Sequence, residues 1–302
     1  MSAWVSALVW LVAGPVLVLA MGPFLDGFGR RVRARLEARR GPPLLQGYSD
    51  LAKLAGKESI SAAVNPVTAI APWVALTSAV TAALLVPLGG ATLLGFGGDM
   101  LVLLYLLGLS SAAIVLGATG SGSAYAFLGA SRELMLLLLV EPVVACGFLV
   151  IGLQAGTFRL DALAAWQLEH GPTVASALAA AAVIVALLAY LGRVPFDLSE
   201  AEQELTGGAL VEFGGRPLAL FRWALFTRWL VAAWVVVEVF LPTPLRGAAG
   251  AAVTALEVLV LFGALSALST LFARLRIDGA RVFLVQIGLL VLFAIAFAVI
   301  GA

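Results

Sequence analysis

Eight apolar segments, each about as long as one membrane crossing, dominate this chain of 302 residues. About 20 apolar residues in a helix are enough to cross the hydrocarbon core of a bilayer. The segments cover residues 2–25, 66–88, 100–118, 134–154, 173–192, 223–241, 251–272 and 282–302. Charged residues make up only 12% of the chain, against about 25% in soluble domains. The sequence therefore predicts an all-α integral membrane protein, with residues 1–302 as a single polytopic domain, and it excludes a soluble enzyme.

The distribution of positive charge predicts how the chain is oriented. Sixteen of the 18 Lys and Arg residues lie in the loops and helix ends that follow the odd-numbered segments; the other two are Arg159 and Arg246. Because Lys and Arg concentrate in cytoplasmic loops, both termini are predicted to lie outside and the loops at 26–65 and 193–222 inside. The first segment has its cations after it rather than before it, so we interpret it as an uncleaved helix.

The inner loop at 26–65 is long enough to contain a helix of its own. Pro42 and Pro43 are suited to the start of a helix, and Leu44, Tyr48 and Leu51 would share its apolar face. Such an amphipathic helix would lie along the inner membrane interface. A simple surface anchor is the alternative interpretation.

The inner loop at 193–222 concentrates carboxylates on the side where cations should dominate. They are Asp197, Glu200, Glu202, Glu204 and Glu212. Ser199 and Glu202 fit a capping box, which predicts a short helix here. Neighbouring carboxylates raise one another's pKa, which suits proton uptake or an arginine-rich partner. A solvated acidic helix with no such role is the alternative.

Ionisable residues also occur inside the predicted spans. Glu141 lies near the middle of the fourth span and is followed by Pro142. Such a charge costs roughly 2.5–3.5 kcal/mol on insertion scales, so it usually marks an ion path or a buried pair. We favour an ion path. Arg228 could pair with the acidic loop, or its side chain could extend to the inner membrane interface. Glu238 and Glu257 could extend to the outer interface.

The residue counts exclude several kinds of cofactor site. Cys146 is the only cysteine and His170 the only histidine, so neither a disulfide, a cysteine-ligated iron–sulfur cluster nor a pair of haem ligands can be built. His170 is interpreted as a polar residue of an extramembrane loop. We expect no cofactor in this chain.

Three segments in order resemble a known family. They are Arg39-Arg40-Gly41-Pro42-Pro43-Leu44-Leu45-Gln46 through Asp50, then Arg132 with Glu141-Pro142, then Arg193-Val194-Pro195-Phe196-Asp197 through Glu212-Phe213-Gly214-Gly215. They resemble the H-type membrane subunit of complex I (NADH:quinone oxidoreductase). They are more similar to its homologue in energy-converting nickel–iron hydrogenases and formate hydrogenlyase, because the first segment is compact and Leu225 stands where complex I members tend to carry an acidic residue.

The resemblance implies a subunit that joins a peripheral redox arm to a proton- or sodium-pumping membrane arm. It places a chain of carboxylates along the ion path: Glu141, Glu200, Glu202, Glu204 and Glu212. It places the peripheral-arm interface at Arg39, Arg40, Asp50 and Asp197, with supporting charges at Arg132, Glu133, Arg193 and Arg228. Partner subunits would carry iron–sulfur clusters and a nickel–iron centre, and antiporter-like subunits would share the membrane. The cytoplasmic membrane of a bacterium or archaeon is the expected location.

Three alternatives remain open. The chain could be the H subunit of a true quinone-reducing complex I, with a quinone chamber, since Glu200-Ala201-Glu202-Gln203-Glu204-Leu205 is very similar to the complex I pattern. A stand-alone secondary transporter would need two related halves, and no repeat relates 1–150 to 151–302. A purely structural anchor would leave Glu141 unexplained.

Overall fold

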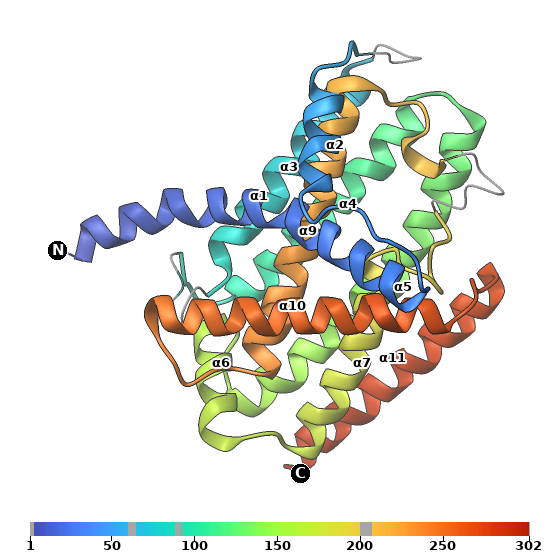
Figure 1. Ribbon diagram of the computed structural model, residues 1–302. Helices are drawn as coiled ribbons and strands as arrows, with labels where there is room; N and C mark the ends of the chain where they lie inside the picture. The colour runs from blue at the N-terminus through green and yellow to red at the C-terminus, as the bar shows by residue number, and fades with distance from the viewer. Residues whose placement is uncertain (1–2, 60–64, 88–91, 93, 200–206, 302) are drawn as a thin grey trace.

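The computed structural model describes residues 3–59, 65–87, 92, 94–199 and 207–301, with side chains from residue 14 onward. Within these ranges the chain forms ten α-helices and one short 3-10 helix (Figure 1). They are α1 (Ala3–Leu36), α2 (Gln46–Ala55), α3 (Pro66–Leu85), α4 (Asp99–Gly120), α5 (Ala124–Ala155), α6 (Leu160–His170), α7 (Val174–Tyr190), η1 (Gly208–Leu210), α9 (Gly215–Phe240), α10 (Gly247–Leu271) and α11 (Ile277–Ile300). The predicted all-α class is confirmed.

Six helices in the described part of the chain are long and apolar enough to cross a membrane: α3, α4, α5, α9, α10 and α11. They coincide with six of the eight predicted spans. The two other predicted spans are occupied by α1 and by α7, which has 17 residues. At a rise of about 1.5 Å per residue, α7 is slightly shorter than the hydrocarbon core is thick. The chain is thus an α-helical integral membrane protein.

Two predicted loop boundaries are wrong. The first helix does not end near residue 25 but continues through the basic stretch to Leu36. Arginines in the last turn of a helix interact favourably with its dipole, and Arg and Leu are good helix formers. Likewise α5 begins at Ala124, so Arg132 and Glu133 are helical residues rather than loop residues. Apolar runs report where a helix meets hydrocarbon, not where its backbone ends.

The segment between α5 and α7 also differs from the prediction. Residues 160–170 form α6, whereas the sequence indicated only a loop. His170 is the last residue of this helix; its ring stacks on Trp166 at 4.5 Å between centroids, and its Nδ1 lies 3.0 Å from the Trp166 carbonyl oxygen. His170 is exposed, so it remains a surface residue, but of a helix rather than of a loop.

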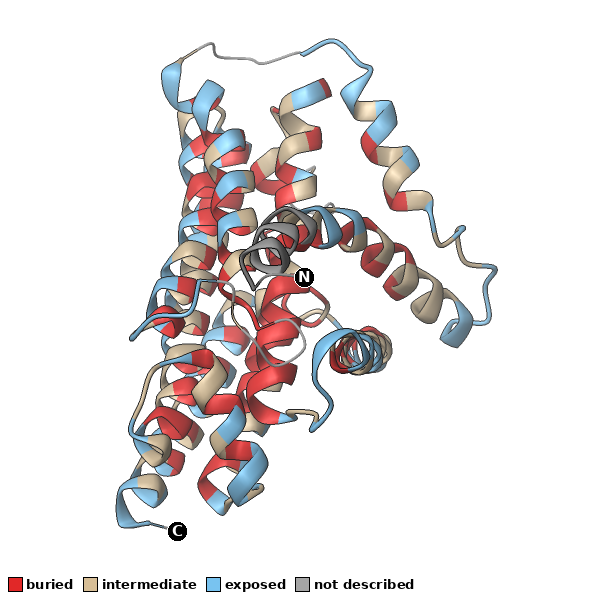
Figure 2. Ribbon diagram, turned by 90° about the vertical axis from the view of Figure 1, so that its left-hand side faces the viewer, coloured by how far each residue is buried: buried red, intermediate tan, exposed pale blue. Residues whose placement is uncertain are grey.

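Helix α9 forms the centre of the molecule. In the most apolar stretch of α9, 18 residues long, 83% of the residues are buried, compared with 17% in the corresponding stretch of α11. It contacts α3, α1, α2, α10, α7 and α6, and buried residues gather in the middle of the bundle, whereas the outer helices show buried, intermediate and exposed residues in alternation (Figure 2). In Figure 1, α10 runs across the bundle. Arg228 and Glu238 of α9 are therefore surrounded by protein rather than by lipid.

The predicted amphipathic helix is present as α2, beside α9 (Figure 1). Leu51 of α2 packs with Ala219 and Phe226 of α9 in a small apolar cluster. The Tyr48 hydroxyl donates a hydrogen bond to the Ala20 carbonyl of α1. Burial raises the pKa of Tyr48, so the phenol keeps its proton and its role as a donor at physiological pH. These contacts attach α2 to both α1 and α9.

Candidate functional site

Glu141 lies in the middle of α5, inside the membrane-spanning part of the chain. Its Oε1 atom is buried, and the described residues offer it no hydrogen-bond partner. A buried polar atom without a partner costs about 1–3 kcal/mol, more for a charged group. A carboxyl group kept in this position is therefore a candidate functional group rather than a structural one.

Gly108 of α4 provides the space for this carboxyl group. A Cβ atom at position 108 would lie only 2.2 Å from Glu141 Oε1. Ordinary contacts between such atoms begin near 3.4 Å. The side chain of Glu141 thus fills the space that a larger residue at position 108 would occupy, and α4 determines where the carboxyl group points.

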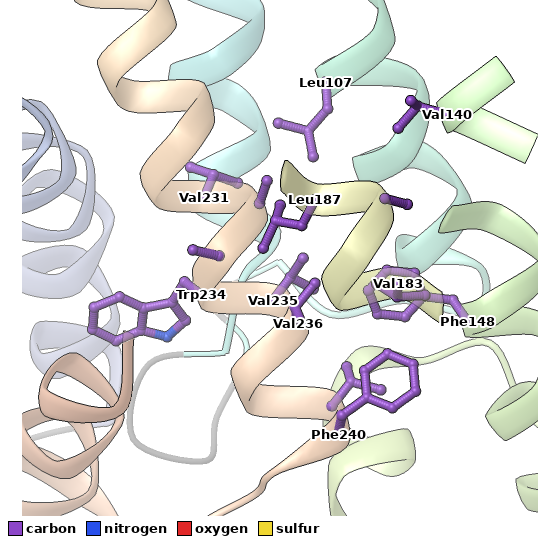
Figure 3. Packing of buried hydrophobic residues seen from close by; sticks show 14 of the residues in the cluster. Leu107, Val140, Phe148, Val183, Leu187, Val231, Trp234, Val235, Val236 and Phe240 are labelled. Carbon is purple, nitrogen blue, oxygen red and sulfur yellow. The ribbon is translucent and has the colours of Figure 1, made fainter. Parts of the chain in front are cut away.

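A cavity of about 240 Å³ adjoins Glu141 between α4, α5, α7 and α9. Most of its lining is apolar, and several of the lining side chains are visible in Figure 3, including Leu107, Phe148, Val183, Leu187 and Val235. Tyr105, which is 79% exposed, lies at its lipid-facing side. Glu141, Tyr105 and Tyr190 carry the polar side-chain groups of an otherwise hydrophobic wall.

Arg228 of α9 lies next to this site at the junction of four helices and is only 2% exposed. Its Nη1 donates a hydrogen bond to the Ser111 hydroxyl of α4. Its Nη2 lies 3.7 Å from Glu133 Oε1 of α5. Its guanidinium carbon lies 5.0 Å from the centre of the Tyr190 ring of α7, within the range of a cation–π interaction. Arg228 is thus a buried cation with an acidic partner, and it does not extend to the interface.

The acidic loop is attached to α5 on the same side as Glu133. Arg132 Nη1 donates a hydrogen bond to the Leu198 carbonyl at 3.3 Å. Within the same loop, η1 packs so closely on α5 that a Cβ at Gly129 would lie 2.4 Å from the Ala209 nitrogen. Both parts of the loop therefore meet α5 about two and a half to three and a half turns before Glu141. Glu200, Glu202 and Glu204, and the predicted capping-box helix, lie outside the described residues; Glu212 is half-buried just after η1.

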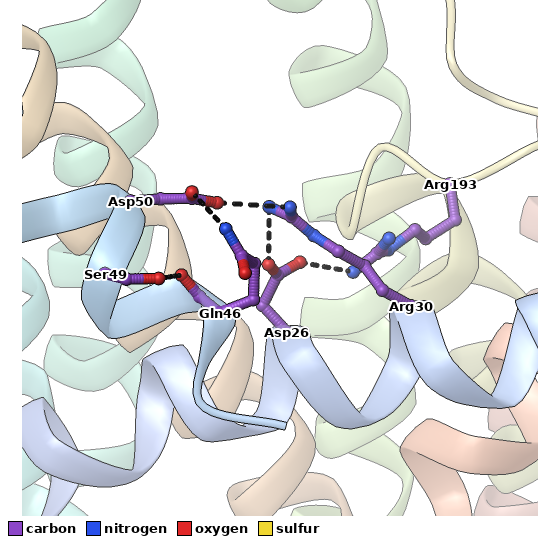
Figure 4. A network of polar contacts seen from close by, with 6 residues as sticks. All are labelled: Asp26, Arg30, Gln46, Ser49, Asp50 and Arg193. Atoms are coloured by element: carbon purple, nitrogen blue, oxygen red, sulfur yellow. Dashed lines mark hydrogen bonds and ion pairs between the residues drawn. The ribbon is translucent and has the colours of Figure 1, made fainter. Parts of the chain in front are cut away.

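A second polar network joins α1, α2 and the start of the acidic loop (Figure 4). Asp26 forms ion pairs with Arg30 at 2.7 Å and with Arg193 at 3.3 Å. Arg30 also reaches Asp50 at 3.3 Å, and Gln46 donates to Asp50 at 2.8 Å. The side chains of Asp26 and Arg193 are 4% and 8% exposed. The network fixes the relative positions of three segments that are far apart in the sequence.

Aromatic rings complete the surroundings of Arg193. Its guanidinium carbon lies 4.8 Å from the Trp229 ring centre and 5.5 Å from that of Phe262. The ring faces stabilise the cation where water is excluded. Arg193 thus connects the loop to α9 and α10 as well as to α1.

The residues predicted to face a peripheral arm do not form one group. Arg39 and Arg40 are exposed, with Arg39 paired to Glu37. Asp50 instead belongs to the internal network described above. Asp197 pairs with Arg274 at 2.7 Å, which ties the acidic loop to the segment before α11.

Sequence reasoning missed Asp26, Gly108 and Ser111. Asp26 precedes Arg30 by four residues, a spacing that favours an ion pair on one helix face, and this signal was available in the sequence. Nothing in the sequence indicated that Gly108 or Ser111 of α4 would face Glu141 and Arg228. The suggestion that Glu238 reaches the outer interface is wrong: it is 4% exposed and accepts a hydrogen bond from Thr254 at 3.2 Å.

In the part of the chain that the structure describes, no three His, Cys, Asp or Glu side chains form a group that could hold a metal ion. Cys146 is a free, half-buried cysteine. The arrangement around Glu141 and Arg228 is suited to moving protons or small cations between carboxylates, because ionisable groups inside membrane spans characteristically form proton relays and ion paths.

The chain is similar to known proteins over most of its length. The model of the NADH dehydrogenase family matches residues 7–300. Hydrogenase-4 component C of Escherichia coli is 35% identical over 238 residues, covering 78% of this chain and 75% of that protein. Formate hydrogenlyase subunit 4 of the same organism is 36% identical over 234 residues, covering 75% of each.

A solved structure has the same fold over nearly the whole length. It is a chain of the membrane-bound sulfane sulfur reductase, described as an archaeal respiratory membrane complex. The TM-score is 0.88 at 25% identity, and the match covers 97% of this chain and 99% of that chain.

Proposed function

The chain belongs to the NADH dehydrogenase family, and from that premise we propose that it is the membrane-anchor and coupling subunit of a proton- or sodium-translocating redox complex. The hydrogenase and formate hydrogenlyase relatives support a complex of that type. The observation that carries the proposal is the group formed by buried Arg228 and the half-buried Glu133 and Glu141 inside the helical bundle. A structural anchor would have no need of these charges, because each is expensive to bury.

The proposed ion path runs from the acidic loop into the bundle. Glu200, Glu202, Glu204 and Glu212 would collect protons at the inner side, where Arg132 and η1 attach the loop to α5. Glu133 and then Glu141 continue the path along α5. A redox event in the peripheral arm would change the charge or position of the loop and thereby the proton affinity of its carboxylates.

The topology that fits this path has eight spans, with α1 and α7 added to the six long helices, and both termini outside. The concentration of Lys and Arg in the inner loops supports this orientation. Arg39, Arg40, Asp50 and Asp197 then lie on the inner side, where a peripheral arm would bind. The exposed arginines would contact the arm directly. A change in the position of the arm would be transmitted by Asp50 to α1 through Arg30.

The partners follow from the same proposal. Peripheral hydrogenase-like and iron–sulfur subunits would carry the nickel–iron centre and the clusters, and antiporter-like subunits would continue the ion path in the cytoplasmic membrane of a bacterium or archaeon. The alternative is the H subunit of an NADH:quinone oxidoreductase, which the family match and the acidic-loop pattern favour.

Co-purification separates these alternatives. The chain would be tagged at its C-terminus, the complex solubilised gently, and nickel, iron and flavin measured in the same sample. Nickel together with iron–sulfur subunits is the expected result. Iron and flavin with bound quinone but without nickel would assign the chain to the alternative, and a chain that purifies alone without metal would contradict both.

We predict that Glu141→Gln abolishes coupled ion movement while leaving the complex assembled. Glutamine has nearly the same shape but cannot take up and release a proton at physiological pH. The measurement is ion translocation per electron pair in proteoliposomes that contain the purified complex, with subunit content checked on the same sample. Wild-type translocation by this variant would remove Glu141 from the path.

A further inference from the structure

Arg228 uses little of its capacity to donate hydrogen bonds. A guanidinium group has five N–H donors. Within the described residues, Nη1 donates to Ser111, and Nε has no partner. The 3.7 Å separation between Nη2 and Glu133 is longer than a charge-assisted hydrogen bond, which is about 2.7–2.9 Å. A buried cation is thus held loosely by its carboxylate partner.

A second carboxyl group lies close to this loosely held cation. Glu141 lines the same cavity as Tyr190, whose ring contacts Arg228, and Glu141 Oε1 lacks a hydrogen-bond partner among the described residues. On α4, Gly108 faces Glu141 and Ser111 faces Arg228, and these two residues are one helical turn apart. Arg228 therefore lies between Glu133 on the inner side and Glu141 deeper in the bundle.

We propose that Arg228 is the positioning residue of this path, and that its guanidinium group alternates between Glu133 and Glu141 as partners. The inference rests on the proposed function, since it assumes that protons pass along α5. Ser111 and the Tyr190 ring contact the head group, and the exchange of partners moves the guanidinium group from one glutamate to the other. The arrangement in the structure corresponds to Arg228 paired with Glu133.

The exchange couples the uptake of one proton to the release of another. With one cation and two carboxyl groups, the group is neutral when one carboxylate is ionised and paired with Arg228 and the other carries a proton. A proton that arrives at Glu133 breaks its pair with Arg228. The guanidinium group then pairs with Glu141, whose proton leaves toward the membrane partner. One proton enters, one leaves, and the net charge of the group is unchanged.

The surroundings of Arg228 make this exchange specific to the two glutamates. In the described structure the ionisable groups that face it are Glu133 and Glu141 from α5 and Tyr190 from α7. Helix α3 has no ionisable residue, and α4 contributes Ser111, which carries no charge. Because the cation stays within the path whichever glutamate it pairs with, it also repels a free hydronium ion or metal cation, so the bundle does not leak when the redox reaction is idle.

The test uses the whole complex in proteoliposomes and compares Arg228→Gln with Arg222→Gln. Arg222 lies on the same helix and is exposed, so the control makes the same chemical change outside the group. For Arg228→Gln we expect electron transfer to continue and coupled translocation to fall about 100-fold or more, the range for a lost proton-transfer group. The pH profile of residual translocation should move upward, because a carboxyl group that loses a neighbouring cation holds its proton more tightly. Arg222→Gln should match the wild type in both measurements.

Two further variants keep the test decisive if Arg228→Gln fails to assemble. Arg228→Lys keeps the charge but loses the planar fork, so it should assemble and retain partial translocation. In Glu133→Gln, Glu141 is the one glutamate of the pair that can still ionise. Arg228 then has no second carboxylate to pair with, so translocation should be lost although the arginine is present. Wild-type translocation and pH profile in Arg228→Gln, or in Glu133→Gln, would overturn the inference. If Glu141→Gln abolishes translocation but Arg228→Gln and Glu133→Gln do not change it, the proposed function stands and only the inference falls. If Glu141→Gln translocates normally, the proposed function itself fails.

Discussion

Replacing Asp26 by Asn is expected to lower the free energy of unfolding by about 3–5 kcal/mol, the usual cost of removing one member of a buried ion pair. Asp26 is the shared partner of Arg30 and Arg193, at 2.7 and 3.3 Å. Asparagine keeps the shape but leaves two cations facing a neutral amide in a site from which water is largely excluded. Unfolding in mixed detergent micelles, followed by circular dichroism, measures the loss.

The matched control for this variant is Asp278→Asn. Asp278 also pairs with an arginine, Arg281, but at 3.9 Å and with 89% of its side chain exposed. Exposed pairs of this kind contribute little to stability, so the control should unfold like the wild type. Equal stability of the two variants would show that the network in Figure 4 does not hold α1, α2 and the acidic loop together.

Replacing Gly108 by Ala is expected to abolish most coupled ion movement without harming the fold. The new Cβ would lie 2.2 Å from Glu141 Oε1, so the flexible glutamate side chain must turn away. Alanine is a better helix former than glycine by roughly 0.5–1 kcal/mol, and α4 should therefore remain intact. A displacement of about 1 Å from a productive geometry can reduce a rate about 100-fold, and translocation per electron pair measures the effect.

Gly288→Ala is the control for the Gly108 variant. Gly288 is also a glycine of an apolar helix, but a Cβ there would meet Val143 at 3.7 Å, an ordinary contact. This variant should translocate ions normally. A second check combines Gly108→Ala with Glu141→Asp, because the shorter side chain withdraws the carboxyl group from the new methyl. The double variant should recover part of the activity that Gly108→Ala loses; full activity of Gly108→Ala alone would contradict the assignment of Gly108.

The apolar runs of the sequence were sufficient to locate the long helices, because each run must be long enough to cross the hydrocarbon core of a bilayer. The segment at 66–88 corresponds to α3, which begins at Pro66 after a capping box formed by Asn65 and Thr68. The ends of helices were less predictable, since a helix can continue into polar sequence at little cost. Arg30 and Glu133 are helical for that reason, and the exposed α6 lacks the long apolar run by which the spans were recognised.

The candidate site could be predicted only in part. Glu141 stands out as a lone carboxylate in an apolar run, and this pattern needs no knowledge of the fold. Its surroundings depend on which helices meet, and periodicity does not encode that. Gly108 has no side chain to attract notice, and Asp26 at the end of the first apolar run resembles an ordinary flanking charge. Both become significant only when their neighbours from α2, α5 and the loop at 193 are in place.

The burial of α9 has a consequence for how the protein is made. A helix that carries Arg228 at about its midpoint enters a bilayer reluctantly, since an arginine there costs roughly 2.5–3.5 kcal/mol on insertion scales. The groups that offset this cost, Ser111, Glu133 and Tyr190, all belong to helices that precede α9 in the sequence. They leave the ribosome first. The order of the helices along the chain therefore allows α9 to pack against helices that are already in the membrane, whereas α11, which is mostly exposed and has no charged residue at its centre, can follow it independently.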